Sequence, residues 1–276
     1  MNPHQDHPTS FSAMLATGRA HHGLVRQLVR REIAARYRGS ILGLAWSFFN
    51  PILMLLVYTF VFSVVFRNRW GGGVADDHVS FAIVLFVGMI IHALFAEVAN
   101  RAPLLIVHNV SYVKRVVFPL EILPVVAMGA ALFHALISLS VLLLAQYLLT
   151  GSLSWTLVFF PLLVAPLVIA TTGVGWFLAA LGVYIRDVAQ TIGIITTIML
   201  FMAPIFYPVS VLSPKLQLLL YLNPLTFVIE EGRKVLLFGQ VPNWPGWFLY
   251  SLLSLAVAKV GFWWFQKTRK GFADVV

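Results

Sequence analysis

Cysteine is absent from this 276-residue chain, which excludes disulfide bonds, thiolate nucleophiles and cysteine-ligated metal sites. Charge is also scarce: Asp, Glu, Lys and Arg make up 11% of the residues, against roughly 25% in an ordinary soluble domain. From residue 122 to residue 185 no charged side chain occurs at all. One helical crossing of a bilayer takes ~20 apolar residues, so this stretch is long enough for two. The sequence therefore indicates an integral membrane protein without a separate soluble domain.

The residues that are present are mostly apolar: 60% are hydrophobic, and the mean hydropathy is +0.89. The formal charge of +9 comes from basic residues that gather in the expected loops. Membrane topology and anionic headgroups account for such clusters, so we do not expect nucleic-acid binding. The first apolar run, residues 41–66, follows a mostly polar segment and exceeds the ~7–15 residues of a signal-peptide core. We expect it to remain as a spanning helix.

The predicted fold is all-α and membrane-integral. Only helices and closed barrels satisfy their backbone groups in lipid, and these runs do not alternate as barrel strands do. We expect a cytoplasmic tail at residues 1–22 and an amphipathic interface helix at 23–38. Six spanning helices follow in a single transmembrane domain, at residues 41–66, 79–96, 122–149, 155–185, 188–207 and 246–265. With both termini in the cytoplasm, most loop Lys and Arg residues lie on the inner side, as membrane proteins prefer.

Residues 208–240 form an unusual segment before the last expected span. Pro208, Pro214 and Pro224 interrupt it, and its apolar stretch at 216–230 is too short to cross a membrane. Because solvated loops rarely contain so many leucines, we expect a re-entrant helical hairpin that dips into the membrane from the outer side. An ordinary folded outer loop is the alternative.

The interface helix, GLVRQLVRREIAARYR, places aliphatic residues on one face and most of its arginines on the other. Such a helix lies in the headgroup plane, so its simplest role is that of an orienting anchor. Arg36 differs because it projects from the apolar side. There its guanidinium could bind a lipid phosphate through two hydrogen bonds, or it could simply extend to solvent. Gly39 and Gly43 allow a tight turn from this helix into the first span.

Two helix faces carry polar or aromatic side chains that contact with lipid does not require. The residues concerned are Gln190, Thr197 and Phe201 in the range 188–207, and Tyr58, Phe62 and Phe66 in the range 41–66. Aromatic rings with polar tips suit sugar rings, which present both C–H and hydroxyl surfaces. These side chains are candidates for lining a conduit, and ordinary helix packing is the alternative.

The source of energy must lie outside this chain. It lacks the GxxxxGK[ST] loop that holds the phosphates of ATP, and it has no paired carboxylates within the expected spans. His92 and His134 do lie within spans, where we expect them to be hydrogen-bonded packing residues.

Four stretches, in this order, resemble the permeases of ABC transporters that export polysaccharides and polyol phosphates. They are REIAARYRGSILGLAWSFFNP (31–51), KRVVFPLEILP (114–124), GVYIRD (182–187) and YPVSVLSPKLQLLLYLNPLTFVIEEG (207–232). Together the four stretches extend the resemblance over most of the chain.

This resemblance implies that two copies of the chain pair with two cytoplasmic ATPase subunits, which bind Mg-ATP and drive the spans between conformations. It also implies a coupling helix in the loop at 100–118, and a smaller ATPase contact at Arg186 and Asp187. The first loop contains four apolar residues in a row, Leu104, Leu105, Ile106 and Val107. Because they are too few to span and too apolar for a free loop, they suit a docking element. Packing on the protein's own helices is the alternative.

The resemblance further implies a lateral gate for the lipid anchor of the cargo, formed where the interface helix meets the first span. The residues assigned to it are Arg36, Tyr37, Arg38, Leu42 and Gly43. The expected cargo is a lipid-linked polysaccharide moved outward across the bacterial inner membrane. O-antigen is the first expectation, followed by capsule or teichoic acid.

Two other classes of function remain open on the sequence alone. An ion-coupled transporter or flippase acting without a partner would use His92, His134 or Glu121. A membrane enzyme or scaffold of glycan synthesis would need an acidic cluster, which only Asp76–Asp77 or Glu230–Glu231 could supply.

Overall fold

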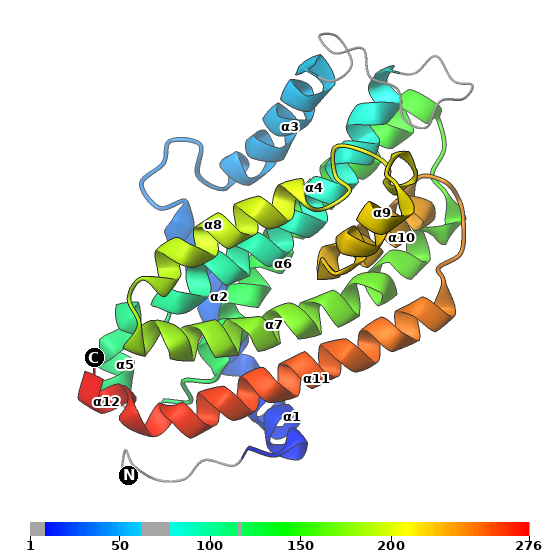
Figure 1. Cartoon of the computed structure of the whole chain (residues 1–276). Coiled ribbons are helices and arrows are strands. Elements are labelled where there is room, and N and C mark those ends of the chain that lie inside the picture. Colours follow the sequence, from blue (N-terminus) through cyan, green and yellow to red (C-terminus); the bar gives the residue numbers. More distant parts are fainter. Residues whose placement is uncertain (1–8, 62–77, 115–117, 276) are drawn as a thin grey trace.

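The computed structural model describes residues 9–61, 78–114 and 118–275, and every regular element in those ranges is a helix (Figure 1). The α-helices are α1 (Phe11–Ala20), α2 (His22–Arg36), α3 (Trp46–Tyr58), α4 (His78–Arg101), α5 (Val110–Lys114), α6 (Ile122–Thr150), α7 (Phe160–Tyr184), α8 (Val188–Phe201), α9 (Pro214–Tyr221), α10 (Pro224–Leu236), α11 (Trp244–Thr268) and α12 (Phe272–Val275). Short 3-10 turns connect several of them: η1 (Gly43–Ala45), η3 (Ala102–Leu104), η4 (Val107–Asn109), η5 (Trp155–Phe159), η6 (Val209–Val211) and η7 (Arg269–Gly271). The all-α prediction is confirmed for this part of the chain.

Within the described ranges, five helical stretches are long and apolar enough to cross a membrane. They are Gly43–Val61, Phe81–Leu104, Ile122–Thr150, Trp155–Tyr184 and Trp244–Val275. Each matches an expected span. The largest shifts are at the ends of the second and last spans, which continue to Leu104 and Val275 instead of ending near residues 96 and 265. The end of the first expected span, with Phe62 and Phe66, lies outside the described residues.

The range expected for another crossing, 188–207, is not one long helix. Helix α8 has 14 residues, from Val188 to Phe201, and at 1.5 Å per residue it is about 21 Å long. The hydrocarbon core of a bilayer is ~30 Å thick. The helix ends early because Pro204 disfavours helical backbone at the residue before it, and residues 202–207 form turns instead.

The N-terminal region contains two helices where the sequence predicted one. Helix α2 corresponds to the expected interface helix at 23–38 and ends at Arg36. Helix α1 lies within residues 1–22, the predicted cytoplasmic tail, for which no helix was predicted. Ser10 caps α1, because its hydroxyl oxygen accepts a hydrogen bond from the amide of Ala13 at 3.2 Å.

The tightest packing in the bundle joins α7 and α11. A methyl group placed on Gly261 would lie 2.0 Å from the carbonyl oxygen of Gly173, so the two backbones touch at these glycines. Small residues permit this approach, which lets two helices associate in lipid through close van der Waals contact. One turn away, Trp176 and Phe262 pack edge to face with their ring centroids 5.2 Å apart.

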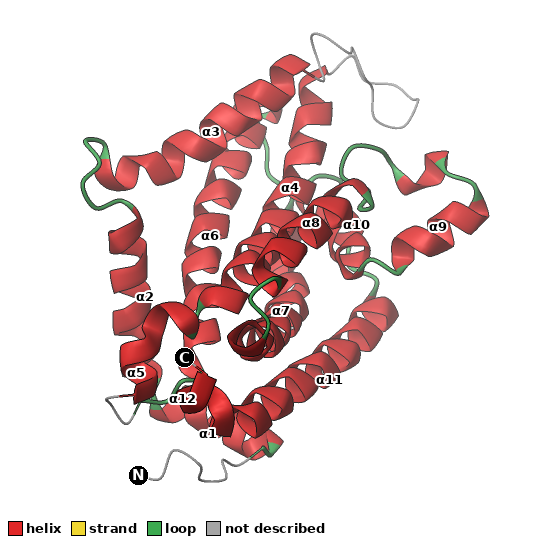
Figure 2. Cartoon of the chain, turned by 60° about the vertical axis from the view of Figure 1, so that its left-hand side comes forward, coloured by secondary structure: helices red, strands yellow, loops and turns green. Residues whose placement is uncertain are grey.

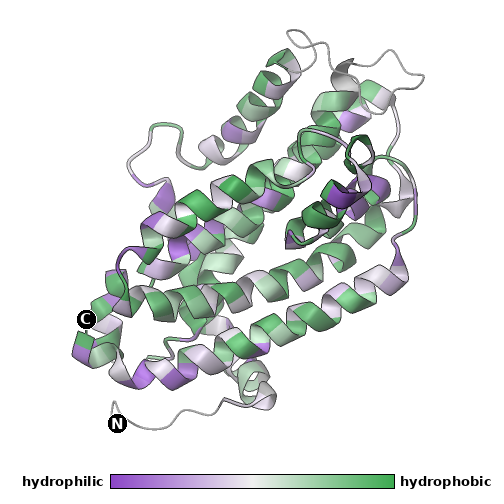
Figure 3. Cartoon of the chain, in the orientation of Figure 1, coloured by the Kyte–Doolittle hydropathy of each residue, from purple (hydrophilic) through white to green (hydrophobic). Residues whose placement is uncertain are grey.

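Figures 1 and 2 show α1, α5 and α12 at one end of the bundle and α9 nearer the other. In Figure 3 the long helices are mostly hydrophobic, while hydrophilic residues gather at helix ends and in α10. The hairpin expected at 208–240 contains two short helices, α9 and α10. Asn223 begins α10, since its side-chain oxygen accepts from the amide of Leu225, and Pro224 follows in the first helical position.

Candidate functional site

The C-terminal end of α2 is held to α4 and α6 by a cluster of charged side chains. The Arg36 guanidinium donates to Glu97 at 2.5 Å, and His134 Nδ1 lies 3.0 Å from both carboxylate oxygens of Glu97. Arg101 forms an ion pair with Glu32 and lies 3.7 Å from Glu97. Arg36 therefore has an anionic partner within its own chain, which the sequence analysis did not anticipate. Its side chain is still 52% exposed, so part of the guanidinium also faces outward.

The expected turn between interface helix and first span is confirmed, and it depends on two glycines. Gly39 has φ of +83° and Gly43 has φ of +50°, a region that side chains with a Cβ disfavour. The Tyr37 ring packs edge-on against His134 with centroids 6.2 Å apart, and burial raises the pKa of its phenol. Arg38 and Leu42 are exposed. The turn thus presents a cationic and apolar surface at the bundle edge.

The predicted coupling segment consists of η3, η4 and α5 rather than one longer helix. Leu104 is exposed, and Leu105 and Val107 are half-buried. Ile106 is fully buried in a cluster with Trp176 and Phe262, so it packs on its own chain, the alternative considered for this segment.

The two stretches predicted to contact an ATPase meet at the same place. A methyl group on Gly182 would lie 2.1 Å from the carbonyl oxygen of Pro103, so the end of α7 rests directly on η3. Arg186 and Asp187 follow α7 within a few residues and are both exposed. Polar side chains at the α7–α8 turn and the apolar Leu104 are therefore presented at one end of the bundle.

The predicted conduit residues lie on α3 and α8, helices with few buried residues. Gln190, Thr197 and Phe201 of α8 are all exposed, and the Thr197 hydroxyl donates to the carbonyl of Gly193 within the helix. Tyr58 of α3 is partly buried against Phe86 of α4, with ring centroids 6.4 Å apart. The structure places all four on helices that pack against α4.

Sequence reasoning missed Arg233, whose side chain is 2% exposed. Its guanidinium donates to the carbonyls of Val84 and Ile205, at 3.1 and 3.0 Å, and to the carboxylate of Glu230 at 2.8 Å. Arg233 ties α10 to α4 and to the turn after α8. The available signal was an arginine one helical turn after Glu230 in a largely apolar segment.

The residues required by the alternative functions are occupied in structural roles. Glu230 pairs with Arg233, while Glu231 pairs with Lys234 and accepts from the amide of Asn243. Asp76 and Asp77 lie outside the described residues.

His92 and Glu121, which an ion-coupled transporter would use, also have partners within the chain. His92 Nε2 lies 2.9 Å from the carbonyl of Thr196, and Glu121 pairs with Arg269 at 2.6 Å. In the ranges 9–61, 78–114 and 118–275, no group of three His, Asp or Glu residues could hold a metal ion.

Comparison with known proteins gives matches along nearly the whole chain. The family described as ABC-2 type transporter matches residues 23–237. The O-antigen export system permease protein RfbA of Myxococcus xanthus is 28% identical over 92% of this chain and 95% of its own length. The protein of the same name from Klebsiella pneumoniae is 26% identical over 90% of this chain and 93% of its own. The polysialic acid transport protein KpsM of Escherichia coli is 22% identical over 86% of this chain and 90% of its own.

Proposed function

Because the chain is a membrane transport subunit of the ABC-2 type transporter family, we propose that it exports a lipid-linked polysaccharide across the bacterial inner membrane. O-antigen is the proposed cargo, with capsular polysaccharide as the next choice. The proposal rests on the end-to-end likeness to permeases whose names state O-antigen export. Mg-ATP would be bound and hydrolysed on a separate ATPase subunit, two of which would act with two copies of this chain.

The proposed topology has six crossings and both termini in the cytoplasm. Helix α1 precedes the first crossing and α12 ends the last helical stretch, and both lie at one end of the bundle (Figure 1). An even number of crossings is required to return the chain to the same side. Helix α8 starts beside the end of α7, and α11 runs back toward α12. The chain must therefore cross once between them, and α8 with residues 202–207 would supply this crossing, the fifth along the chain. The α9–α10 hairpin would then sit in the outer half of the membrane.

The ATPase would bind at the end of the bundle where η3 and the α7–α8 turn meet. Leu104, Arg186 and Asp187 are exposed there, and Leu105 and Val107 are half-buried beside them. Ile106, being fully buried, would support this surface from below. Contact at η3 would be transmitted directly to α7 through the close approach of Pro103 and Gly182.

The lipid anchor would enter at the α2–α3 turn, where Arg36, Arg38 and Leu42 combine cationic and apolar side chains beside Tyr37 and Gly43. The glycan would follow the faces of α3 and α8 that carry Tyr58, Gln190, Thr197 and Phe201. Two copies would close this path, because much of both helices is exposed in the single chain. Membrane lipids would surround the remaining faces.

Co-purification with the partner ATPase tests the proposed docking surface. We expect Leu104→Asp to release the ATPase while the permease stays folded in the membrane. Leu153→Asp is the matched control, because Leu153 is an exposed leucine in the turn between α6 and η5, away from α5 and α12. Retention of the ATPase by both variants would contradict the docking surface.

Cross-linking tests the proposed pairing of two copies. The chain has no cysteine, so a single introduced thiol reports only on its own position. We expect Ile198→Cys, on the exposed face of α8, to give a cross-linked dimer with a short bifunctional thiol reagent. Val260→Cys on the exposed face of α11 should remain monomeric. The reverse pattern would place the interface on α11 instead.

A further inference from the structure

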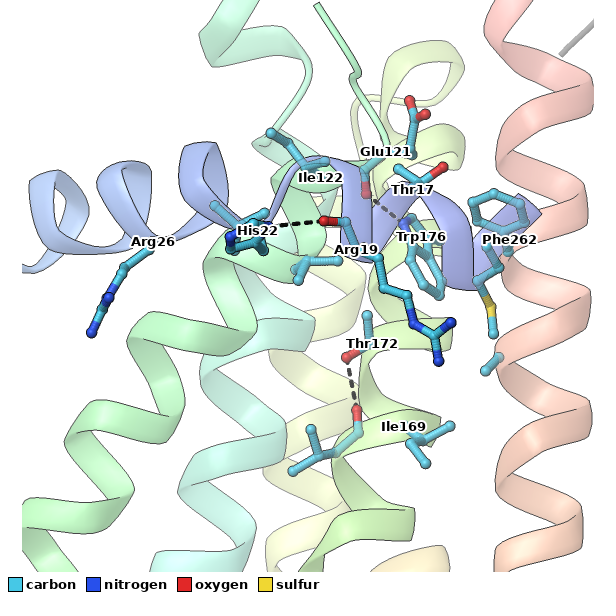
Figure 4. Close-up of a pocket in the computed structure, with 16 residues that line it drawn as sticks. Thr17, Arg19, His22, Arg26, Glu121, Ile122, Ile169, Thr172, Trp176 and Phe262 are labelled. Atoms are coloured by element: carbon cyan, nitrogen blue, oxygen red, sulfur yellow. Dashed lines mark hydrogen bonds between the residues drawn. The ribbon is translucent and has the colours of Figure 1, made fainter. Parts of the chain in front are cut away.

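A cavity of about 520 Å³ lies between the α1–α2 pair and the spanning helices α6, α7 and α11 (Figure 4). Its walls are largely apolar and include Val125 of α6, Ile169 of α7 and Phe262 of α11. The volume falls within the ~300–1,000 Å³ typical of pockets that hold small molecules. None of the proposed gate, docking or conduit residues lines it, so it is separate from the transport path proposed above.

Basic side chains border this apolar space. Arg19, His22 and Arg26 come from α1 and α2. Figure 4 shows the Arg19 and Arg26 side chains on the same side of these helices as Thr172 and Ile169, along the spanning part of α7. Among the residues that the structure describes, no carboxylate forms an ion pair with either guanidinium. Two cationic groups therefore lie at the mouth of an apolar cavity beside the membrane-spanning helices.

Glu121 also borders the cavity, but its carboxylate does not neutralise these arginines. It bonds to Arg269 at 2.6 Å and points away from Arg19 in Figure 4. The backbone carbonyl of Glu121 accepts from the Trp176 indole at 2.8 Å, which fixes the wall of the cavity at this point. The His22 ring is bonded to the Arg19 carbonyl at 2.9 Å, which holds the α1–α2 junction over the cavity.

We propose that this cavity binds an anionic phospholipid from the leaflet at the α1–α2 end of the bundle. Its phosphate would be bound by Arg19, whose guanidinium offers paired donors that match phosphate oxygens, and Arg26, on the other side of His22 in Figure 4, would attract the same negative charge. Part of an acyl chain would fill the space between α7 and α11. Free phosphate would leave the apolar walls uncovered, and a zwitterionic lipid would not neutralise the arginines. The bound lipid would hold the α1–α2 pair against α6, α7 and α11.

Lipid binding to the full chain, purified in a neutral detergent, tests this proposal by native mass spectrometry. Phosphatidylglycerol should bind saturably, and phosphatidylcholine with the same acyl chains should bind at least ~10-fold more weakly, as expected for two basic contacts. Arg19→Gln and Arg26→Gln should each weaken phosphatidylglycerol binding roughly fivefold, and the double variant roughly 25-fold. The matched control is Arg30→Gln, which removes an exposed arginine of α2 that does not line the cavity and should leave the affinity unchanged.

A second variant tests the apolar part of the site. Ile169→Trp narrows the cavity without changing its charge and should weaken binding of phosphatidylglycerol. Size-exclusion profiles identify variants that fail to fold. If the double arginine variant fails to fold, the two single arginine variants decide the question. The proposal is overturned if the two lipids bind equally, if Arg30→Gln weakens binding as much as Arg19→Gln, or if inorganic phosphate displaces the lipid. None of these outcomes depends on the cargo or on the ATPase.

Discussion

Helix α4 and the α3–α8 pair are packed very differently. In the most apolar 18-residue stretch of the α4 span, 78% of the residues are buried. In the corresponding stretch of the first span, Gly43–Val61, only 11% are buried. On α8, Ile194 and Ile198 are 56% and 51% exposed. Helix α4 is enclosed by its own chain, while α3 and α8 need lipid or a second copy to cover them. We interpret the packed helices as the fixed part of the subunit and α3 with α8 as the part that meets its surroundings.

The largest expected effect comes from the close contact of α7 and α11. Gly261→Val would drive a side chain into the backbone of α7 and should destabilise the fold by more than ~3 kcal/mol, the upper end for overpacking. The yield of monodisperse protein and its thermal unfolding measure this effect. Gly193→Ala on α8 is the contrast, because no atom lies within 4 Å of the added methyl group. It should be neutral or raise stability by up to ~1 kcal/mol. Equal losses of stability in both variants would contradict the difference in packing between the α7–α11 contact and α8.

Arg233→Met tests the link from α10 to the packed helices. It should cost about 3 kcal/mol of unfolding free energy, because two buried carbonyls, of Val84 and Ile205, lose their donor. Thermal unfolding in detergent gives the value. Lys215→Met removes an exposed positive charge from α9 and should change stability by less than ~0.5 kcal/mol. A loss below 1 kcal/mol for Arg233→Met would mean that the hairpin is held mainly by apolar packing.

Glu97→Gln tests how α2 is anchored to α4. It weakens the bonds to Arg36 and His134, and we expect a local loss of about 1–2 kcal/mol, since its partners are only partly buried. Hydrogen exchange should become faster in α2, with little change in overall unfolding. Asp274→Asn removes an exposed carboxylate from α12 and should leave α2 unchanged. Unaltered exchange in the Glu97 variant would show that apolar contacts alone hold α2 in place.

The smallest effect on the single chain is expected on α8. Ile198→Ala removes a side chain that is half exposed, so the stability of the monomer should change by less than ~0.5 kcal/mol. The same change should weaken association of two copies, which sedimentation in detergent measures. A large loss of monomer stability would show that α8 belongs to the packed part of the subunit.

The spans could be predicted because they depend on a local property, the length of an uncharged apolar run. The same holds for the α2–α3 turn, where Gly39 and Gly43 both adopt positive φ. Helix α8 was predicted too long because the effect of Pro204 was not weighed against the apolar run that continues past Phe201. Helix α1 was missed because its ten residues are too few to span a membrane and lie in a mostly polar segment.

Long-range partners could not be read from one sequence. Arg36 bonds to Glu97 in a different span, and Arg233 bonds to main-chain carbonyls of α4 and of the turn after α8. A main-chain carbonyl has no sequence signature, so only the fold identifies these contacts. The burial of Ile106 depends in the same way on helices that are distant in sequence.

Transport in reconstituted vesicles tests the central claim most directly, namely that this chain moves its cargo only when a separate ATPase hydrolyses ATP. Vesicles would contain the permease alone, or the permease with its ATPase, together with a lipid-linked polysaccharide on the ATPase side. We predict that the polysaccharide reaches the opposite side only with both proteins and ATP present. Equal transport by the permease alone would contradict the account.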